Sequence, residues 1–263
     1  MQITFYKYQA TGNDFIIIDN RSNLFDKNNT KLIEKLCDRR FGIGADGLIL
    51  IELEKNCDFK MIYFNSDGHQ STMCGNGGRC VVAFAKKIDL IKSEAFFLAI
   101  DGHHHAKIEG SFIELKMKNV TELKKIGDDY LLDTGSPHYV SFKSNVSEID
   151  VNTAGAQIRN RKIFKENGVN VNFVEQKSEN NFFVRTYERG VESETLSCGT
   201  GATAVAIAMH VSKKTSMNKI IINTQGGVLR VNFSINKSHY TDVWLCGPAK
   251  YVYQGTLNKN FNI

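Results

Sequence analysis

Short hydrophobic runs separated by turn-forming residues dominate the first hundred positions of the chain. Segments of this kind, bounded by Gly, Asn, Asp or Ser, are typical of β-strands. We predict strands at residues 3–8, 15–19, 47–52, 59–64 and 96–100. Residues 30–41 instead carry Leu32, Ile33, Leu36 and Cys37 at helical spacing, and Gly42 is a typical helix stop. The pattern predicts a mixed chain of short strands and few helices.

Two further segments, residues 80–85 and 202–208, are rich in Ala and Val and hydrophobic on nearly every side. A helix of this composition is usually buried in a core. Each segment follows a cysteine in a glycine-rich stretch, Cys74 in one case and Cys198 in the other. We therefore expect each cysteine at the N-terminus of a buried helix.

These two stretches belong to an internal repeat. Cys74 and Cys198 are 124 residues apart, and the same offset relates Tyr63 to Tyr187 and Gly44 to Gly168. Five such matches in one order indicate a duplicated domain. We predict an α/β fold of the α+β type, with two pseudo-symmetric domains that are each a curved mixed sheet wrapped around a central helix. The expected domains are residues 1–117 and 118–251, and the tail 252–263 could join the first.

Composition narrows the function classes. The 263 residues are 42% hydrophobic and 23% charged, which is typical of soluble globular proteins. The net charge of +5 is spread along the chain, so no nucleic-acid partner is expected. No hydrophobic run approaches the ~18 residues of a membrane helix, and the N-terminus does not resemble a signal peptide. We expect a cytoplasmic protein whose six cysteines are not structural disulfides.

A cysteine at a helix N-terminus has a defined chemistry. Unpaired backbone N–H groups and the helix dipole favour the thiolate and can also hold a carboxylate. They can lower a cysteine pKa well below its free value of ~8.5. If both helix N-termini face one cleft, a thiolate can remove an α-proton while a thiol protonates the opposite face. That arrangement inverts a stereocentre without a cofactor.

The other candidate sites are weaker. Cys37, Cys57, Cys80 and Cys246 are expected to be small hydrophobic residues. A zinc site at Cys74 and Cys80 would lack a second ligand pair, so no metal is expected. The three consecutive histidines at residues 103–105 could bind a metal, but a solvated turn is favoured because neighbouring side chains point in different directions.

Ordered motifs along nearly the whole chain resemble the diaminopimelate epimerase family. They are GNDF at residues 12–15, RRFGIGADG at 39–47, FNSDG at 64–68, MCGNG at 73–77, GSPH at 135–138, NVNF at 170–173, YERG at 187–190, CGTG at 198–201 and GPA at 247–249.

The resemblance implies cofactor-independent interconversion of LL- and meso-diaminopimelate on the route to lysine and peptidoglycan, by a homodimer whose lobes close on this small-molecule substrate. It implies Cys74 and Cys198 as the two bases. The substrate contacts it implies are Asn13, Asn65, Gly75, Asn76, Ser136, Asn170, Glu188, Arg189, Gly199 and Thr200. The chain departs from the common family pattern at Gly47, at Ser136 and in the loop before Cys198, which is one residue longer.

Other functions stay open at this point. A proline or hydroxyproline racemase would share the two cysteines but take a substrate without a distal amino acid. An isomerase resembling the phenazine-pathway protein would not use a cysteine pair. A two-lobed amino-acid-binding protein would need a cleft but no sulfur.

Overall fold

The computed structural model describes residues 2–164, 167–237 and 239–258. It divides into two compact units, one formed by the chain up to Leu115 and from Pro248 onward, the other by Lys116–Gly247. The first unit ends at Leu115, two residues before the expected boundary at residue 117. The chain rejoins that unit at Pro248, four residues before the expected start of the tail at residue 252. Residues 259–263 of that tail lie outside the described part.

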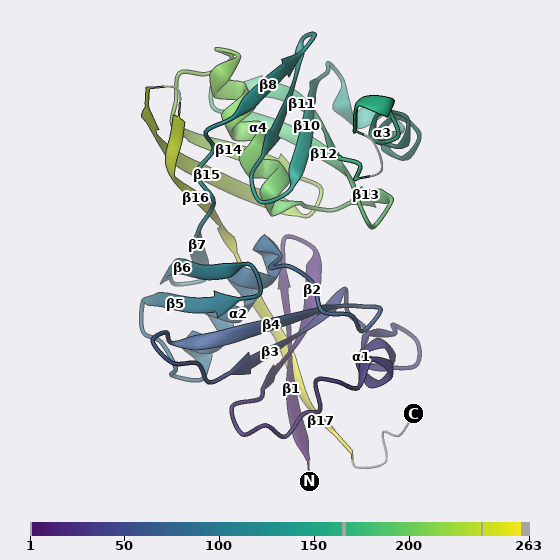
Figure 1. The fold of residues 1–263 in the computed structure, drawn as a ribbon, viewed down its shortest axis with the longest axis vertical. Helices are drawn as coiled ribbons and strands as arrows, with labels where there is room; N and C mark the ends of the chain where they lie inside the picture. The colour runs from purple at the N-terminus through teal and green to yellow at the C-terminus, as the bar shows by residue number, and fades with distance from the viewer. Residues whose placement is uncertain (1, 165–166, 238, 259–263) are drawn as a thin grey trace. The chain divides into compact units, whose positions relative to one another are not determined.

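Unit 1 is a mixed sheet around one helix (Figure 1). Its strands are β1 (Ile3–Ala10), β2 (Asn13–Asp19), β3 (Gly47–Glu52), β4 (Phe59–Asn65), β5 (Glu94–Ala99), β6 (Gly102–Glu109), β7 (Phe112–Lys116) and β17 (Lys250–Leu257), and its helices are α1 (Thr30–Cys37) and α2 (Gly75–Lys87). The pairs β2–β3 and β4–β5 are parallel, and β17–β1, β1–β2, β3–β4, β5–β6 and β6–β7 are antiparallel.

Unit 2 repeats this plan. Its strands are β8 (Leu123–Ile126), β9 (Asp129–Asp133), β10 (Pro137–Phe142), β11 (Asn170–Ser178), β12 (Asn181–Glu188), β13 (Ser193–Thr195), β14 (Lys219–Thr224), β15 (Gly227–Asn236) and β16 (His239–Pro248). Its α-helices are α3 (Val151–Arg159) and α4 (Gly199–Val211), with 3₁₀ turns at Val146–Glu148 and Lys162–Phe164. The pairs β10–β11 and β12–β14 are parallel, and β8–β9, β9–β10, β11–β12, β14–β15 and β15–β16 are antiparallel.

The duplication extends to the strand register. Phe15 pairs with Gly47 in the parallel β2–β3 ladder, and Tyr139 pairs with Val171 in the parallel β10–β11 ladder, 124 residues further on. The order of parallel and antiparallel pairs is the same in both units. The predicted fold, a mixed sheet around a central helix in each half, is confirmed.

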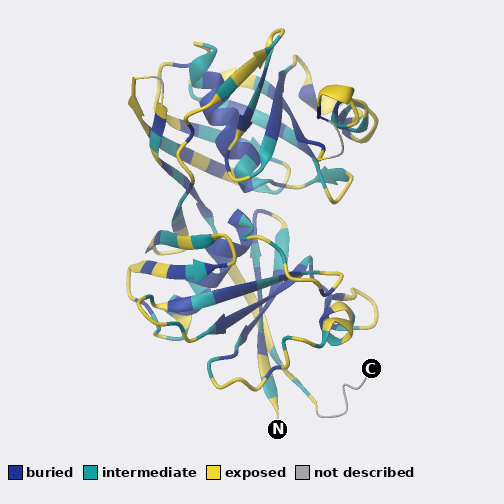
Figure 2. Cartoon of the chain, viewed as in Figure 1, coloured by how far each residue is buried: buried dark blue, intermediate teal, exposed yellow. Residues whose placement is uncertain are grey.

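The helices α2 and α4 form the cores of their units (Figure 2). From Gly75 to Ala85 every residue of α2 except Ala83 is buried, and α4 is buried from Gly201 to Met209. Burial on all sides explains why neither segment has a polar face. The hydrophobic pattern correctly predicted both as core helices.

The helix predicted at residues 30–41 is shorter than expected, because α1 ends at Cys37. Asp38 is extended, and its carboxylate accepts hydrogen bonds from the backbone of Arg40 and Phe41 at 2.7 Å each. The chain then folds back so that Ile43 and Gly44 donate to the carbonyl of Leu36. These bonds satisfy the helix end, so no further helical turn is needed.

The solvated turn predicted for His103–His105 is wrong. These residues lie within strand β6, where the ring of His103 stacks on Phe96 and that of His104 on Phe97. Stacking on the neighbouring strand favours an extended conformation. Within the described ranges, no group of three or more His, Cys, Asp or Glu side chains could hold a metal ion.

Candidate active site

Cys74 immediately precedes helix α2 in unit 1, in an extended conformation. Glycines let this helix begin deep in the core: a Cβ on Gly78 would lie 3.0 Å from Met73 Sδ and 3.1 Å from Leu115. The predicted site residues Gly75 and Asn76 form its first turn and are buried. The first backbone N–H groups of a helix have no partner within the helix, so this end suits a carboxylate.

The Cys74 sulfur faces Asn13. Its thiol donates to Oδ1 of Asn13 across 3.6 Å, and Nδ2 of Asn76 donates to the same oxygen across 3.4 Å. The predicted residues Asn13, Cys74 and Asn76 therefore form one group of contacts. An amide oxygen can only accept, so this contact requires Cys74 to carry its proton.

Arg79 is a functional candidate that the sequence analysis missed. Its side chain is fully buried within α2, where it donates to Asn76 Oδ1 at 2.7 Å, to Thr11 Oγ1 at 3.2 Å and to the Gly75 carbonyl at 3.3 Å. A buried guanidinium supplies a permanent positive charge one helical turn from the cysteine. In the sequence, Arg79 is marked only by its place five residues after Cys74, and this place alone does not show that its side chain is buried.

Asn65 lies at the same sheet edge as Asn13. Asn65 ends β4 and pairs with Gly47 at the start of β3, while Phe15, two residues after Asn13, pairs with Gly47 from the other side. Position 47 has no room for a side chain, because a Cβ there would lie 2.5 Å from the Phe64 carbonyl oxygen. This close approach explains the absence of a side chain at Gly47.

Cys198 caps helix α4 in unit 2. Its sulfur accepts a hydrogen bond from the backbone N–H of Gly201 at 3.4 Å and lies 3.4 Å from Oγ1 of Thr200. Gly201 is required here, because a Cβ would lie 2.5 Å from Oδ1 of Asn172 and 3.4 Å from the sulfur. The predicted residues Cys198, Gly199 and Thr200 thus form the first turn of a buried helix.

A buried hydrogen-bond chain orients the Thr200 hydroxyl. Asn172 donates through Nδ2 both to the Tyr139 carbonyl and to Nδ1 of His138, at 3.1 Å each, while its oxygen accepts from Thr186. The carbonyl fixes which way the amide points, so Nδ1 of His138 must accept. The neutral ring then carries its proton on Nε2, 2.9 Å from Oγ1 of Thr200.

The His138 ring is neutral at working pH. Burial lowers the pKa of His138 to about 3, and the charge of Arg189 adds to this effect while Asp133 opposes it. With Nε2–H donating to Thr200, the hydroxyl hydrogen of Thr200 is available to the Cys198 sulfur. When the Thr200 hydroxyl donates to it, the Cys198 sulfur receives two hydrogen bonds, one from Thr200 and one from the Gly201 backbone, and these stabilise its thiolate form.

Ser136, Asn170 and Arg189 form a second group in unit 2. Asn170 donates to Ser136 Oγ at 2.9 Å and accepts from the backbone N–H of Arg189 at 2.9 Å. The guanidinium of Arg189 donates to Ser136 Oγ at 3.2 Å and to the Asn167 carbonyl at 3.0 Å. The predicted Glu188 ends β12 and accepts from Thr195 at 2.9 Å.

The other four cysteines lie in different surroundings. Burial raises the pKa of Cys37 to about 12, and it also raises the pKa of Cys80. Cys246 is buried, and Cys57 donates to the Phe59 carbonyl. Thiols whose pKa is raised by burial are poor nucleophiles and poor bases.

Comparison with known sequences decides the family. The sequence model of diaminopimelate epimerase matches residues 5–109 and 130–252. A diaminopimelate epimerase of Flavobacterium psychrophilum is 60% identical over 254 residues, covering 96% of this chain and 99% of that protein. The chain belongs to the diaminopimelate epimerase family. The diaminopimelate epimerase of Chlorobaculum tepidum is 40% identical, covering 94% of this chain and 98% of that protein.

Membership of this family makes the protein an enzyme of the isomerase class. Solved structures agree in fold. A phenazine biosynthesis protein of the PhzF family from Bacillus anthracis has a TM-score of 0.78 at 15% identity, covering 98% of this chain and 99% of that one. A hydroxyproline epimerase from Agrobacterium vitis has a TM-score of 0.71 at 11% identity, covering 97% and 92%.

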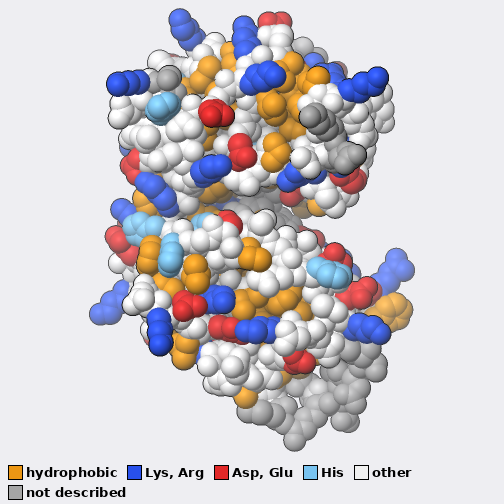
Figure 3. Space-filling view, viewed as in Figure 1, with side chains coloured by type: hydrophobic (Ala, Val, Ile, Leu, Met, Phe, Trp, Pro, Cys, Tyr) orange, Lys and Arg blue, Asp and Glu red, His pale blue; other side chains and the backbone are white. Residues whose placement is uncertain are grey.

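The surface of each unit carries charges of both signs (Figure 3). On the face of each unit seen in Figure 3, lysine and arginine side chains are scattered among carboxylates and do not form a continuous basic patch. Of the helices in the part of the chain that the structure describes, none is long and apolar enough to cross a membrane.

Proposed function

We propose that the protein interconverts LL- and meso-diaminopimelate by moving one proton at an α-carbon, without a cofactor. One observation carries this proposal: two thiols, 124 residues apart in a duplicated fold of this family, precede matching buried helices. In the proposed closed enzyme, unit 1 supplies Cys74 to one face of the α-carbon and unit 2 supplies Cys198 to the other.

The hydrogen bonds support different resting states for the two sulfurs. Cys198 accepts hydrogen bonds and is proposed to be the thiolate, whereas Cys74 donates to Asn13 and is proposed to be the thiol. The Cys198 thiolate takes the α-proton, and the Cys74 thiol delivers its own proton to the opposite face. The products are an inverted α-carbon, a Cys198 thiol and a Cys74 thiolate.

The reverse reaction begins from that second state. Cys74 must then exist as a thiolate, and the buried charge of Arg79, bonded to the carbonyl beside it, stabilises this form. Negative charge developing on the substrate carboxylate would be stabilised by the N–H groups of Gly75, Asn76, Gly199 and Thr200. Dipoles already in position contribute strongly to such catalysis.

The other predicted residues fit the distal amino acid of this substrate. The guanidinium of Arg189 is a suitable partner for its carboxylate and the carboxylate of Glu188 for its ammonium group. The amides of Asn13, Asn65 and Asn170 and the hydroxyl of Ser136 can donate and accept, which suits a zwitterion. We further propose that the enzyme is a cytoplasmic homodimer that serves lysine and peptidoglycan precursor synthesis.

Deuterium uptake from heavy water tests the proposal. Uptake at the α-carbon of diaminopimelate, with none into proline or hydroxyproline, is expected. Cys74→Ala and Cys198→Ala should each abolish epimerisation while calorimetry still detects substrate binding. Uptake into proline alone would instead make the protein a proline racemase, and near-normal epimerisation by either variant would remove the two-base mechanism.

A further inference from the structure

The contact between Cys74 and Asn13 depends on how the Asn13 amide is turned. An amide presents an acceptor oxygen on one side and a donor nitrogen on the other. With the oxygen toward sulfur, the S–H bond has an acceptor and the thiol is favoured. With the nitrogen toward sulfur, the amide would donate instead and the thiolate would be favoured.

Asp46 holds this orientation from the nitrogen side of the amide, while Nδ2 of Asn76 donates to the amide oxygen. Asp46 accepts through its Oδ2 from Nδ2 of Asn13 at 2.5 Å and from the backbone N–H of Asp14 at 3.2 Å. Its Oδ1 accepts from Arg39 at 2.8 Å. An ionised carboxylate can only accept, so the Asn13 nitrogen must face Asp46 and the oxygen is left facing Cys74.

Asp46 is itself held by a compact set of charges. Its backbone N–H donates to the Asp14 side chain at 3.2 Å, and Asp14 also binds Arg39 at 2.6 Å and the buried ammonium of Lys7 at 2.7 Å. Two carboxylates and two cations balance one another. The carboxylate of Asp46 is held in position by Arg39 and by the Asp14 backbone N–H.

The duplication gives independent support. Asp46 precedes Gly47 in the parallel β2–β3 ladder, and Asn170 precedes Val171, the matching residue of the β10–β11 ladder. Asn170 likewise orients its neighbours, through hydrogen bonds to Ser136 and to the Arg189 backbone. The same position of the repeat therefore holds polar groups of the site in both units.

We propose that Asp46 is a positioning residue for the reaction: it holds the Asn13 amide with its oxygen toward Cys74, and so keeps a proton on that sulfur in the resting enzyme. This inference rests on the proposed function, which requires Cys74 to be the proton donor in one direction. Asp46 does not itself touch the reacting atoms in this account.

Replacing the carboxylate with an amide removes the constraint on the Asn13 nitrogen and leaves only the 3.4 Å hydrogen bond from Asn76 to the Asn13 oxygen. In an Asp46→Asn variant, the residue can offer Asn13 either a donor or an acceptor, so the Asn13 amide can turn its nitrogen toward sulfur. The midpoint of Cys74 alkylation against pH should fall by about one pH unit. At a pH below both midpoints, Cys74 should therefore react with iodoacetamide up to ~10-fold faster.

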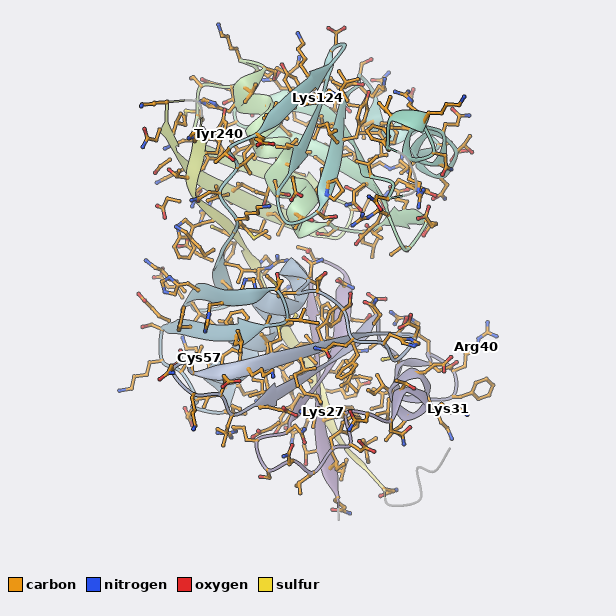
Figure 4. The ribbon with its side chains drawn as sticks, viewed as in Figure 1. Lys27, Lys31, Arg40, Cys57, Lys124 and Tyr240 are labelled. Atoms are coloured by element: carbon orange, nitrogen blue, oxygen red, sulfur yellow. The ribbon has the colours of Figure 1, made fainter. Side chains whose placement is uncertain are left out.

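The experiment measures iodoacetamide alkylation of the full chain without substrate, between pH 5 and 10, with each cysteine quantified by peptide mapping. Glu52→Gln is the matched control. Glu52 also bridges an asparagine and a cation in unit 1, accepting from Asn20 at 2.8 Å and from Lys27 at 2.7 Å (Figure 4 labels Lys27). The Asn20 amide faces the Phe25 backbone and not a thiol.

We expect Asp46→Asn to lower the Cys74 midpoint and leave the Cys198 midpoint unchanged, and Glu52→Gln to move neither. In an Asn13→Ala background the Asp46→Asn change should have no further effect. If Asp46→Asn does not fold, Asp46→Ala, which removes the acceptor for the Asn13 nitrogen, should shift the midpoint in the same direction.

An unchanged Cys74 midpoint in a folded Asp46 variant, or an equal shift at both cysteines, would overturn the positioning role. Alkylation requires no turnover, so it separates this inference from the function. If the Asp46 variant shows the shifted Cys74 midpoint but the unsubstituted protein moves no deuterium into diaminopimelate, the proposed function is overturned and the contact geometry stands.

Discussion

The hydrogen bond from Thr200 to Cys198 makes a quantitative prediction. Thr200→Val keeps the side-chain shape and removes only the hydroxyl, whose oxygen lies 3.4 Å from the Cys198 sulfur. Hydrogen bonds to charged groups contribute about 1.5–3 kcal/mol, and this long contact belongs at the lower limit. Since one pKa unit corresponds to about 1.36 kcal/mol, the variant should raise the alkylation midpoint of Cys198 by about one pH unit.

The assay is the pH dependence of iodoacetamide alkylation at Cys198, with the buried Cys37 as an internal unreactive reference. Thr200→Ser restores the hydroxyl and should restore the midpoint. Epimerisation that begins with Cys198 as the base should slow by up to ~10-fold below the midpoint, because the thiolate fraction falls by that factor. An unchanged midpoint in Thr200→Val, or failure of Thr200→Ser to restore it, would refute the orientation of this hydroxyl.

Three further outcomes are expected. Gly201→Ala should destabilise the fold by about 1–3 kcal/mol, because its methyl group would meet Asn172 Oδ1 at 2.5 Å, and an unchanged urea midpoint would contradict this. Burial acts to raise the pKa of Asp14, but hydrogen bonds and charges from Arg39 and Lys7 lower it to about 2. The ionised Asp14 therefore stabilises the fold above about pH 4, and this contribution is lost as pH falls toward 2. Asp14→Asn should lower the unfolding free energy at pH 7 by about 2 kcal/mol, and a difference between variant and unsubstituted protein that does not shrink in acid would argue against this. Arg189→Lys should raise the KM for diaminopimelate roughly tenfold, since an ammonium cannot replace a bidentate guanidinium, and an unchanged KM in steady-state assays would exclude the proposed contact.

Local pattern was sufficient to predict much of the fold. The predicted strand at 47–52 coincides with β3, three others differ from observed strands by one or two residues at one end, and the strand predicted at 96–100 starts two residues late and ends one residue late against β5. Hydrophobic periodicity succeeds here because strands and buried helices expose or bury side chains at fixed spacing. The end of α1 was misplaced because Asp38 and the returning chain satisfy its last carbonyls, an interaction that no periodicity records.

The electrostatic networks could not be predicted in this way. The residues that turn the Asn13 amide and the Thr200 hydroxyl lie 33 and 62 positions away in sequence, and only the fold brings them into contact. The tautomer of His138 follows from Asn172 on the neighbouring strand β11, whose amide is oriented by the Tyr139 carbonyl. Glycine-rich stretches before two apolar runs were enough to suggest where the sulfurs lie, but not which of them carries the proton.

A crystal structure of the enzyme with an unreactive diaminopimelate analogue would show whether the two sulfurs share one α-carbon. The two-base mechanism requires the sulfurs of Cys74 and Cys198 to lie within roughly 3.5 Å of the same α-carbon and on opposite faces, in near-attack geometry. Sulfurs that approach different atoms of the ligand, or a ligand bound against one unit with the second sulfur far from it, would contradict this mechanism.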